Sequence, residues 1–102
     1  MIKAMFEYTE NKVVFSINGH ANAGEYGNDL VCAATTGIVS GMLNVFDKRY
    51  AGMTDIKVDE NNITVEFNMI NENIEQDIDT LLTQLKTLEI QYPKNLKIKE
   101  VH

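Results

Sequence analysis

The stretch LVCAATTGIVSGMLNVF, residues 30–46, carries no charged side chain over its seventeen residues. Its large apolar side chains lie around most of the circumference of a helix, which is typical of a helix covered on more than one side. Small residues such as Ala33, Gly37 and Gly41 lower the helix propensity but let a sheet, another helix or a second subunit approach the backbone closely. The stretch therefore predicts a central helix on which other elements pack, with a partner chain covering part of it.

The same stretch is where a membrane helix would be suspected first. About twenty mostly apolar residues are needed to span a bilayer, and these seventeen are rich in Thr, Ser, Gly and Asn. We therefore expect no membrane span. Asn28 or Asp29 is expected to cap the helix, which ends near Tyr50, just before Gly52. Such a start places Cys32 in about the first turn.

Alternating apolar and polar residues on both sides of the helix predict two β-hairpins. Strict alternation is the pattern of strands with one buried face, and each pair of runs is separated by polar turn residues. The first pair is residues 2–8 and 13–17, around a turn at 10–12, and the second is residues 56–58 and 63–69, around a turn at 59–62.

A second helix and a last strand follow. Either Asn71 or Asn73 is a suitable cap, and Pro93 stops the helix. Its apolar residues at helical spacing are Ile74, Ile78, Leu81, Leu82, Leu85 and Leu88. Leu96, Ile98 and Val101 then alternate with Lys97, Lys99 and Glu100 as a short strand whose lysines suit an exposed edge.

The order strand, strand, helix, strand, strand, helix, strand predicts one α+β domain over residues 1–102. We expect a two-layer sandwich with two helices packed on one face of a mostly antiparallel sheet. The sequence has 102 residues and shows no linker or internal repeat, so a second domain is not expected.

Charge and cysteine content narrow the function. A net charge of -6 argues against direct nucleic-acid binding, which depends on Lys and Arg at phosphates, and favours a basic partner. One cysteine cannot form an internal disulfide, and the start MIKAMFEYTEN lacks the basic flank and apolar run of a secretion signal. The expected compartment is the cytoplasm.

Cys32 follows His20 by twelve residues across a glycine-rich loop. A thiol is a nucleophile only as thiolate, and an ordinary thiol, with a reference pKa of about 8.5, is mostly protonated near neutrality. An imidazole that accepts the proton activates it, and a helix start near the sulfur adds a modest bias. On its own, a free cysteine is more often a buried packing residue, and one Cys with one His is too few for the usual metal site. No metal or cofactor is expected.

The loop between the first hairpin and the helix admits two interpretations. Gly19, Gly24 and Gly27 are either ordinary turn residues or parts of a lid that shapes a peptide groove. Glu25 and Asp29 are a solvated acid and a helix cap by default, but either carboxylate is suited to orienting His20 and stabilising its protonated form. The residues alone leave these alternatives open.

The motifs Gly19-His20-Ala21, Gly24-Glu25-Tyr26-Gly27 and Asp29-Leu30-Val31-Cys32-Ala33-Ala34 resemble the signature of the ribosomal-processing cysteine proteases, the Prp family. The order of the motifs and the gap between them match, and the length and the expected element order fit as well. The resemblance covers essentially the whole chain, although similarity outside the signature is weak.

The resemblance implies a homodimeric endopeptidase with Cys32 as nucleophile and His20 as general base. It further implies that the substrate is a basic large-subunit ribosomal protein whose short N-terminal extension is cut after an aromatic residue. The residues that it places around the dyad or the substrate are Gly19, Gly24, Glu25, Tyr26, Gly27, Asp29 and Thr36. Thr36 departs from the family, which usually has serine there, so its role is open.

Two other functions compete with the protease. One is a non-catalytic peptide-binding or ribosome-assembly module. In such a module Cys32 would be a packing residue and the loop would recognise a peptide, so reagents would alkylate Cys32 slowly. A third possibility keeps the nucleophile but changes the substrate to a thioester or another acyl compound, which ester hydrolysis without peptide cleavage would indicate.

Overall fold

The protein is represented by a computed structural model, which describes residues 1–19 and 26–102, with the backbone alone for residues 26–29. Over these residues the chain forms five strands and two helices. In chain order they are β1 (Ile2–Tyr8), β2 (Val13–Asn18), α1 (Tyr26–Tyr50), β3 (Thr54–Val58), β4 (Asn62–Phe67), α2 (Glu72–Gln91) and β5 (Leu96–Val101).

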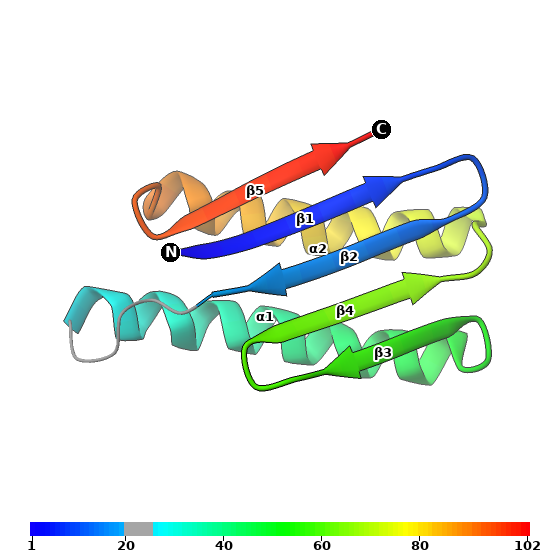
Figure 1. Ribbon diagram of the computed structural model, residues 1–102, viewed down its shortest axis with the longest axis horizontal. Helices are drawn as coiled ribbons and strands as arrows, with labels where there is room; N and C mark the ends of the chain where they lie inside the picture. Colours follow the sequence, from blue (N-terminus) through cyan, green and yellow to red (C-terminus); the bar gives the residue numbers. More distant parts are fainter. Residues whose placement is uncertain (20–25) are drawn as a thin grey trace.

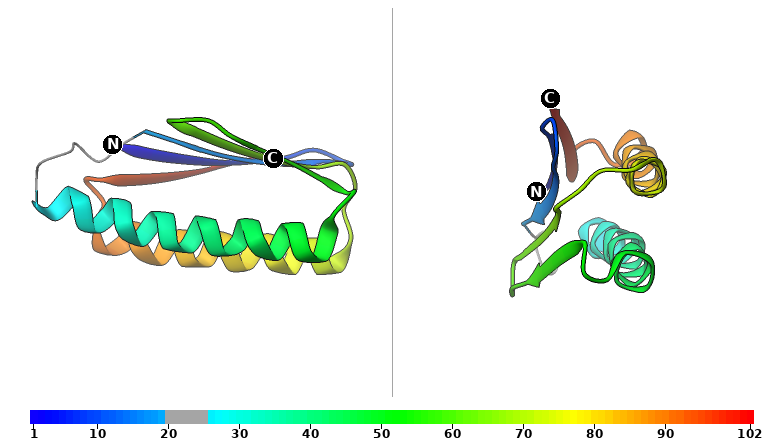
Figure 2. Two further views of the ribbon diagram at one scale, coloured as in Figure 1. Left: turned by 90° about the horizontal axis from the view of Figure 1, so that it is seen from below. Right: turned by 90° about the vertical axis from the view of Figure 1, so that its right-hand side faces the viewer.

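The strands form a single sheet in the order β3-β4-β2-β1-β5. Neighbouring strands are antiparallel except β1 and β5, which pair in parallel through Ile2↔Leu96 to Glu7↔Val101. Figure 1 shows both helices running along the sheet, and the end view in Figure 2 places them side by side on one face of it. The predicted two-layer α+β sandwich with a mostly antiparallel sheet is confirmed.

The core lies between the helices and the inward face of the sheet. Phe6 and Phe15 face each other across β1 and β2 with ring centroids 4.8 Å apart, and Phe46 of α1 meets Phe67 of β4 edge-on at 4.9 Å. Each fully buried apolar side chain contributes about 1.5–3 kcal/mol relative to an exposed one. The alternation in the two hairpins therefore fixes which face of the sheet receives the helices.

The structure of α2 agrees with the pattern in its sequence. The side chain of Asn71 accepts a hydrogen bond of 2.9 Å from the backbone N–H of Ile74, which makes Asn71 the cap. The helix ends at Gln91, two residues before Pro93. Its buried residues are the predicted ones: Ile74, Ile78, Leu81, Leu82, Leu85 and Leu88.

Helix α1 begins at Tyr26, earlier than predicted. Asn28 and Asp29 lie inside the helix rather than at its cap, so Cys32 lies in the second turn. The expectation of a first-turn sulfur was wrong because Asp and Asn also occur within the first turn, where the helix dipole favours an acid. By length and composition alone Leu30–Tyr50 is sufficient to cross a membrane, but here its inward side chains pack on the sheet.

Three apolar residues expected on the core side of strands are exposed. Val58 is 63 % exposed at the end of the edge strand β3, and Met69 is 45 % exposed beyond the end of β4. Val101 is 39 % exposed, because the period of two along β5 turns residues 96, 98 and 100 to one face and 97, 99 and 101 to the other. The lysines do lie on an edge strand, as predicted.

Polar contacts join the carboxyl end of α1 to α2. One guanidinium nitrogen of Arg49 donates to both carboxylate oxygens of Asp77, at 2.9 and 3.1 Å, and the hydroxyl of Tyr50 donates to Asp77 at 2.5 Å. Tyr50 is only 5 % exposed. These bonds fix the orientation of the two helices far along α1 from Cys32.

Candidate active site

Cys32 lies partly exposed on α1 and lines a cavity of about 160 Å³. Residues three, four, seven and eight positions further along a helix share a face with it, and Thr35, Thr36, Val39 and Ser40 line the same cavity. The thiol is therefore placed on a wall that a ligand can reach, rather than sealed in the core.

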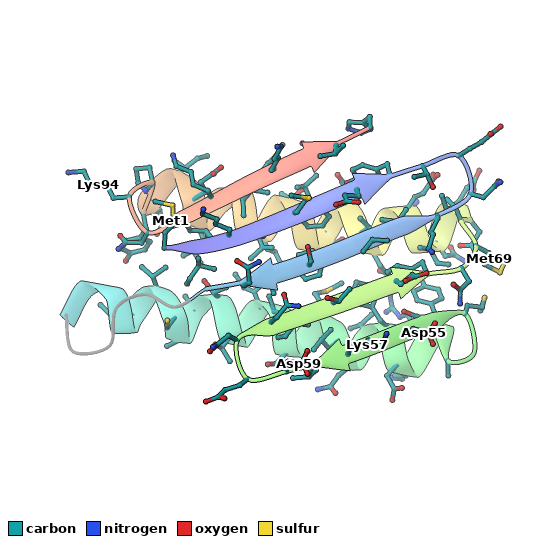
Figure 3. The ribbon with its side chains drawn as sticks, in the orientation of Figure 1. Met1, Asp55, Lys57, Asp59, Met69 and Lys94 are labelled. Atoms are coloured by element: carbon teal, nitrogen blue, oxygen red, sulfur yellow. The ribbon has the colours of Figure 1, made fainter. Side chains whose placement is uncertain are left out.

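The opposite wall comes from one end of the sheet. The register pairs Lys3 with Asn18 and Asn18 with Asn62, so the start of β1, the end of β2 and the start of β4 meet there. The lining residues from these strands and the β3–β4 turn are Ile2, Ile17, Asn18, Gly19, Asp59, Glu60, Asn61, Asn62 and Ile63. Figure 3 labels Asp59 at this turn.

Gly19 fixes the edge of the cavity where β2 ends. Its φ is +94°, in the region that favours glycine, and a Cβ at this position would overlap the carbonyl oxygen of Met1. Its N–H donates to the carbonyl of Asn61 at 3.4 Å. The backbone at Gly19 therefore lies between the start of β1 and the β3–β4 turn. The contact with Met1 leaves no room for a side chain.

The predicted site residues divide by what the structure describes. Cys32, Gly19 and Thr36 are brought together around one cavity. His20, Gly24 and Glu25 lie outside the described residues, and Tyr26, Gly27 and Asp29 are in α1 with side chains outside the description. The Cys32–His20 dyad stays a prediction, as do the assisting roles of Glu25 and Asp29.

The sequence analysis did not identify Thr35 or the turn at residues 59–62 as part of the site. Thr35 could have been found from its helical spacing, since it follows Cys32 by three residues. The turn could be placed only by knowing that β4 pairs with β2. Across the described residues, no group of three His, Cys, Asp or Glu side chains could hold a metal ion, and the expectation of no cofactor stays a prediction.

Comparison with known proteins decides the family. The family model described as cysteine protease Prp matches residues 1–97. The chain belongs to the Prp family of cysteine proteases. It is therefore a cysteine protease, and the resemblance seen in the motifs around Cys32 is confirmed.

Two curated relatives and one solved structure agree with this family. The ribosomal processing cysteine protease Prp of Staphylococcus aureus strain Mu50 is 31 % identical over 93 residues, which cover 87 % of this chain and 88 % of the relative. The Prp of Bacillus subtilis strain 168 is 31 % identical over 107 residues and 96 % of each chain. A crystal structure of Staphylococcus aureus Prp with a covalently linked product peptide has a TM-score of 0.80 at 25 % identity, covering 98 % of this chain and 99 % of the other.

Proposed function

We propose that this chain removes the short N-terminal extension of a large-subunit ribosomal protein, cutting after an aromatic residue, with Cys32 as nucleophile and His20 as general base. The observation that carries the proposal is the placement of Cys32, partly exposed, on the wall of a cavity that Gly19 also lines. His20 follows Gly19 directly in the sequence.

Two properties of the cavity support the proposed substrate. An apolar cavity of about 150 Å³ in another protein binds benzene, so a cavity of about 160 Å³ suits one aromatic ring. The acidic residues Asp59 and Glu60 are among those that line it, and the net charge of the chain is -6. Both favour a basic peptide such as the end of a ribosomal protein. Such a substrate also supports action in the cytoplasm.

The proposed chemistry is acyl transfer. His20 takes the proton of the thiol, the sulfur of Cys32 attacks the scissile carbonyl, and the C–N bond breaks as His20 protonates the leaving amine. Water activated by His20 then hydrolyses the thioester. Because α1 begins at Tyr26, the N–H groups without an acceptor inside the helix are those of the first four residues. The oxyanion is therefore assigned to these N–H groups or to the glycine loop, and not to the amide of Cys32.

The test uses the full-length extended ribosomal protein from the same organism, incubated with the enzyme and measured by mass spectrometry. The wild type should release one fragment that ends in an aromatic residue, and Cys32→Ala should bind the protein without cutting it. Cleavage by Cys32→Ala at the same bond would reject Cys32 as the nucleophile. If the wild type leaves the extended ribosomal protein intact, the proposal that this protein is the substrate is rejected.

Alkylation tests the dyad separately, because Cys32 is the only cysteine of the chain and modification is read at one site. The rate of alkylation at pH 7 should be higher in the wild type than in His20→Ala, because the proposed base takes the proton of the thiol. His102, which is exposed and stacks on Tyr8 with ring centroids 4.6 Å apart, gives the matched control His102→Ala. Equal alkylation rates for the wild type and His20→Ala would contradict the role of His20.

A further inference from the structure

Thr35 is unusual among the polar residues of the structure. Its side chain is buried, with 5 % exposed. Its hydroxyl oxygen has no hydrogen-bond partner. Buried polar atoms are nearly always paired, so an unpaired one needs an explanation.

Other threonines show what a helical hydroxyl ordinarily does. Thr80 donates to the carbonyl of Gln76 at 3.0 Å, and Thr87 donates to that of Thr83 at 2.8 Å. Both bonds run back four residues along α2, the usual partner of Ser and Thr within a helix. Thr35 is in the same kind of backbone but makes no such bond.

The position of Thr35 points to a ligand. It lies three residues beyond Cys32 on the same face of α1, about 4.5 Å along the axis, and both residues line the cavity. Threonine has two allowed χ1 rotamers in a helix, so rotation about one bond gives the hydroxyl a second position. Because both side chains line one cavity, a peptide bound at Cys32 is also a candidate ligand of Thr35.

A main-chain group of the substrate is the partner that fits. A hydroxyl both donates and accepts, and an extended peptide presents an N–H and a C=O at every residue. We propose that the hydroxyl of Thr35 binds the main chain of the substrate peptide beside the bond that Cys32 attacks, which makes Thr35 a substrate-binding residue. The proposal rests on the proposed function, because it takes a peptide as the ligand.

The experiment compares Thr35→Val, which keeps the shape and removes the hydroxyl, with Thr35→Ser, which keeps the hydroxyl. Thr87→Val is the matched control, since its hydroxyl already has a partner and lies away from the cavity. The melting temperature, and kcat and KM on a peptide spanning the cleavage site of the extended ribosomal protein, are measured for all variants.

Thr35→Val should melt about 4 °C above the wild type, because it removes an unpaired buried hydroxyl. Its KM should rise about fivefold with kcat nearly unchanged, the result of losing a contact made equally in ground and transition states. Thr35→Ser should keep KM within about twofold, and Thr87→Val should change KM by less than that.

Each other result overturns the proposal. A higher melting temperature with an unchanged KM means that the hydroxyl has no ligand. An unchanged or lower melting temperature means that it turns to a partner within the protein, such as the carbonyl four residues earlier. A loss in Thr35→Ser equal to that in Thr35→Val means that shape matters and not the hydroxyl. If the wild type fails to cut the peptide, the proposed function falls too, whereas the first three results leave it standing.

Discussion

At the scale of single residues, Gly19 shows how one backbone position serves both the fold and the site. It directly follows β2, its backbone lies against the carbonyl of Met1, and it lines the cavity of Cys32. The sequence resemblance marked Gly19 as part of a motif, while the structure supplies the physical reason. A side chain there would have to occupy the space of the carbonyl of Met1.

Gly19→Ala should lower the free energy of unfolding by more than about 2 kcal/mol, because a left-handed alanine costs about 1–2 kcal/mol before any overlap is added. Peptide cleavage should fall as well, since the cavity edge must move. Gly52→Ala is the control, because Gly52 has a φ of +88° with no atom within 4 Å of the added Cβ. Both effects are measured by urea unfolding and by kcat/KM. Equal losses in the two variants would show that the overlap has no cost.

The same scale shows how much of the site the sequence could reveal. Cys32, Gly19 and Thr36 were found because their motif is local in the chain, and the structure brings them to one cavity. The turn at residues 59–62 was missed because its place depends on β4 pairing with β2, a contact between distant segments. No local pattern states which strand lies beside which.

At the scale of elements, strong periodicity predicted more than single capping residues did. Six apolar positions fixed the buried face of α2 correctly. The start of α1 was misjudged because Asn28 and Asp29 suit a cap and a first turn almost equally. The prediction that Val101 shares a face with Leu96 and Ile98 was wrong, because it followed the hydrophobicity of Val101 and not the two-residue period of a strand. The inward position of Glu100 is tolerated since its carboxylate accepts a 2.7 Å bond from Lys86 of α2.

Tyr50 gives the contact between α1 and α2 a pH dependence. Burial, followed by the hydrogen bond and the charge of Asp77, raises the pKa of Tyr50 from 10.0 to about 12. In the unfolded chain the phenol loses its proton near pH 10. A raised folded pKa stabilises the protein fully below pH 10, and this contribution is lost as the pH rises toward 12.

The free energy of unfolding should therefore fall between pH 10 and 12, as measured by urea denaturation at each pH. Tyr50→Phe should be less stable at pH 8, because Asp77 loses one donor, and should show a smaller decrease over the same interval. If the free energy of unfolding of Tyr50→Phe decreases as steeply as that of the wild type, groups other than Tyr50 cause the decrease.

At the scale of the whole molecule, the face of α1 that points away from the sheet supports the dimer that the sequence predicts. Gly37 and Gly41 are exposed, and a Cβ at either one meets no atom within 4 Å. The neighbouring exposed residues Ala33 and Asn44 are small or uncharged. We propose that this face packs against the same face of a second copy, because small residues let two backbones approach closely.

Gly37→Arg should convert the dimer to a monomer in multi-angle light scattering while keeping the melting cooperative. The added side chain has open space within its own chain, but it would separate two closely packed helices. Thr83→Arg, on the exposed face of α2, is the control and should stay dimeric. A wild type that is monomeric at micromolar concentration contradicts the dimer, and a dimeric Gly37→Arg places the contact elsewhere.

The parallel pairing of β5 with β1 has a consequence for biosynthesis. In the element order β1 comes first and β5 last, so the ribosome makes β5 only after β1 and the five elements between them. Until β5 emerges, one edge of β1 presents unpaired backbone N–H and C=O groups beside the apolar residues Ile2 and Phe6. Such an edge can pair with a strand of another chain. The edge of β1 is therefore covered only when β5 pairs with it, at the end of synthesis. A pause in translation before residue 96 would leave an intermediate that is prone to aggregation.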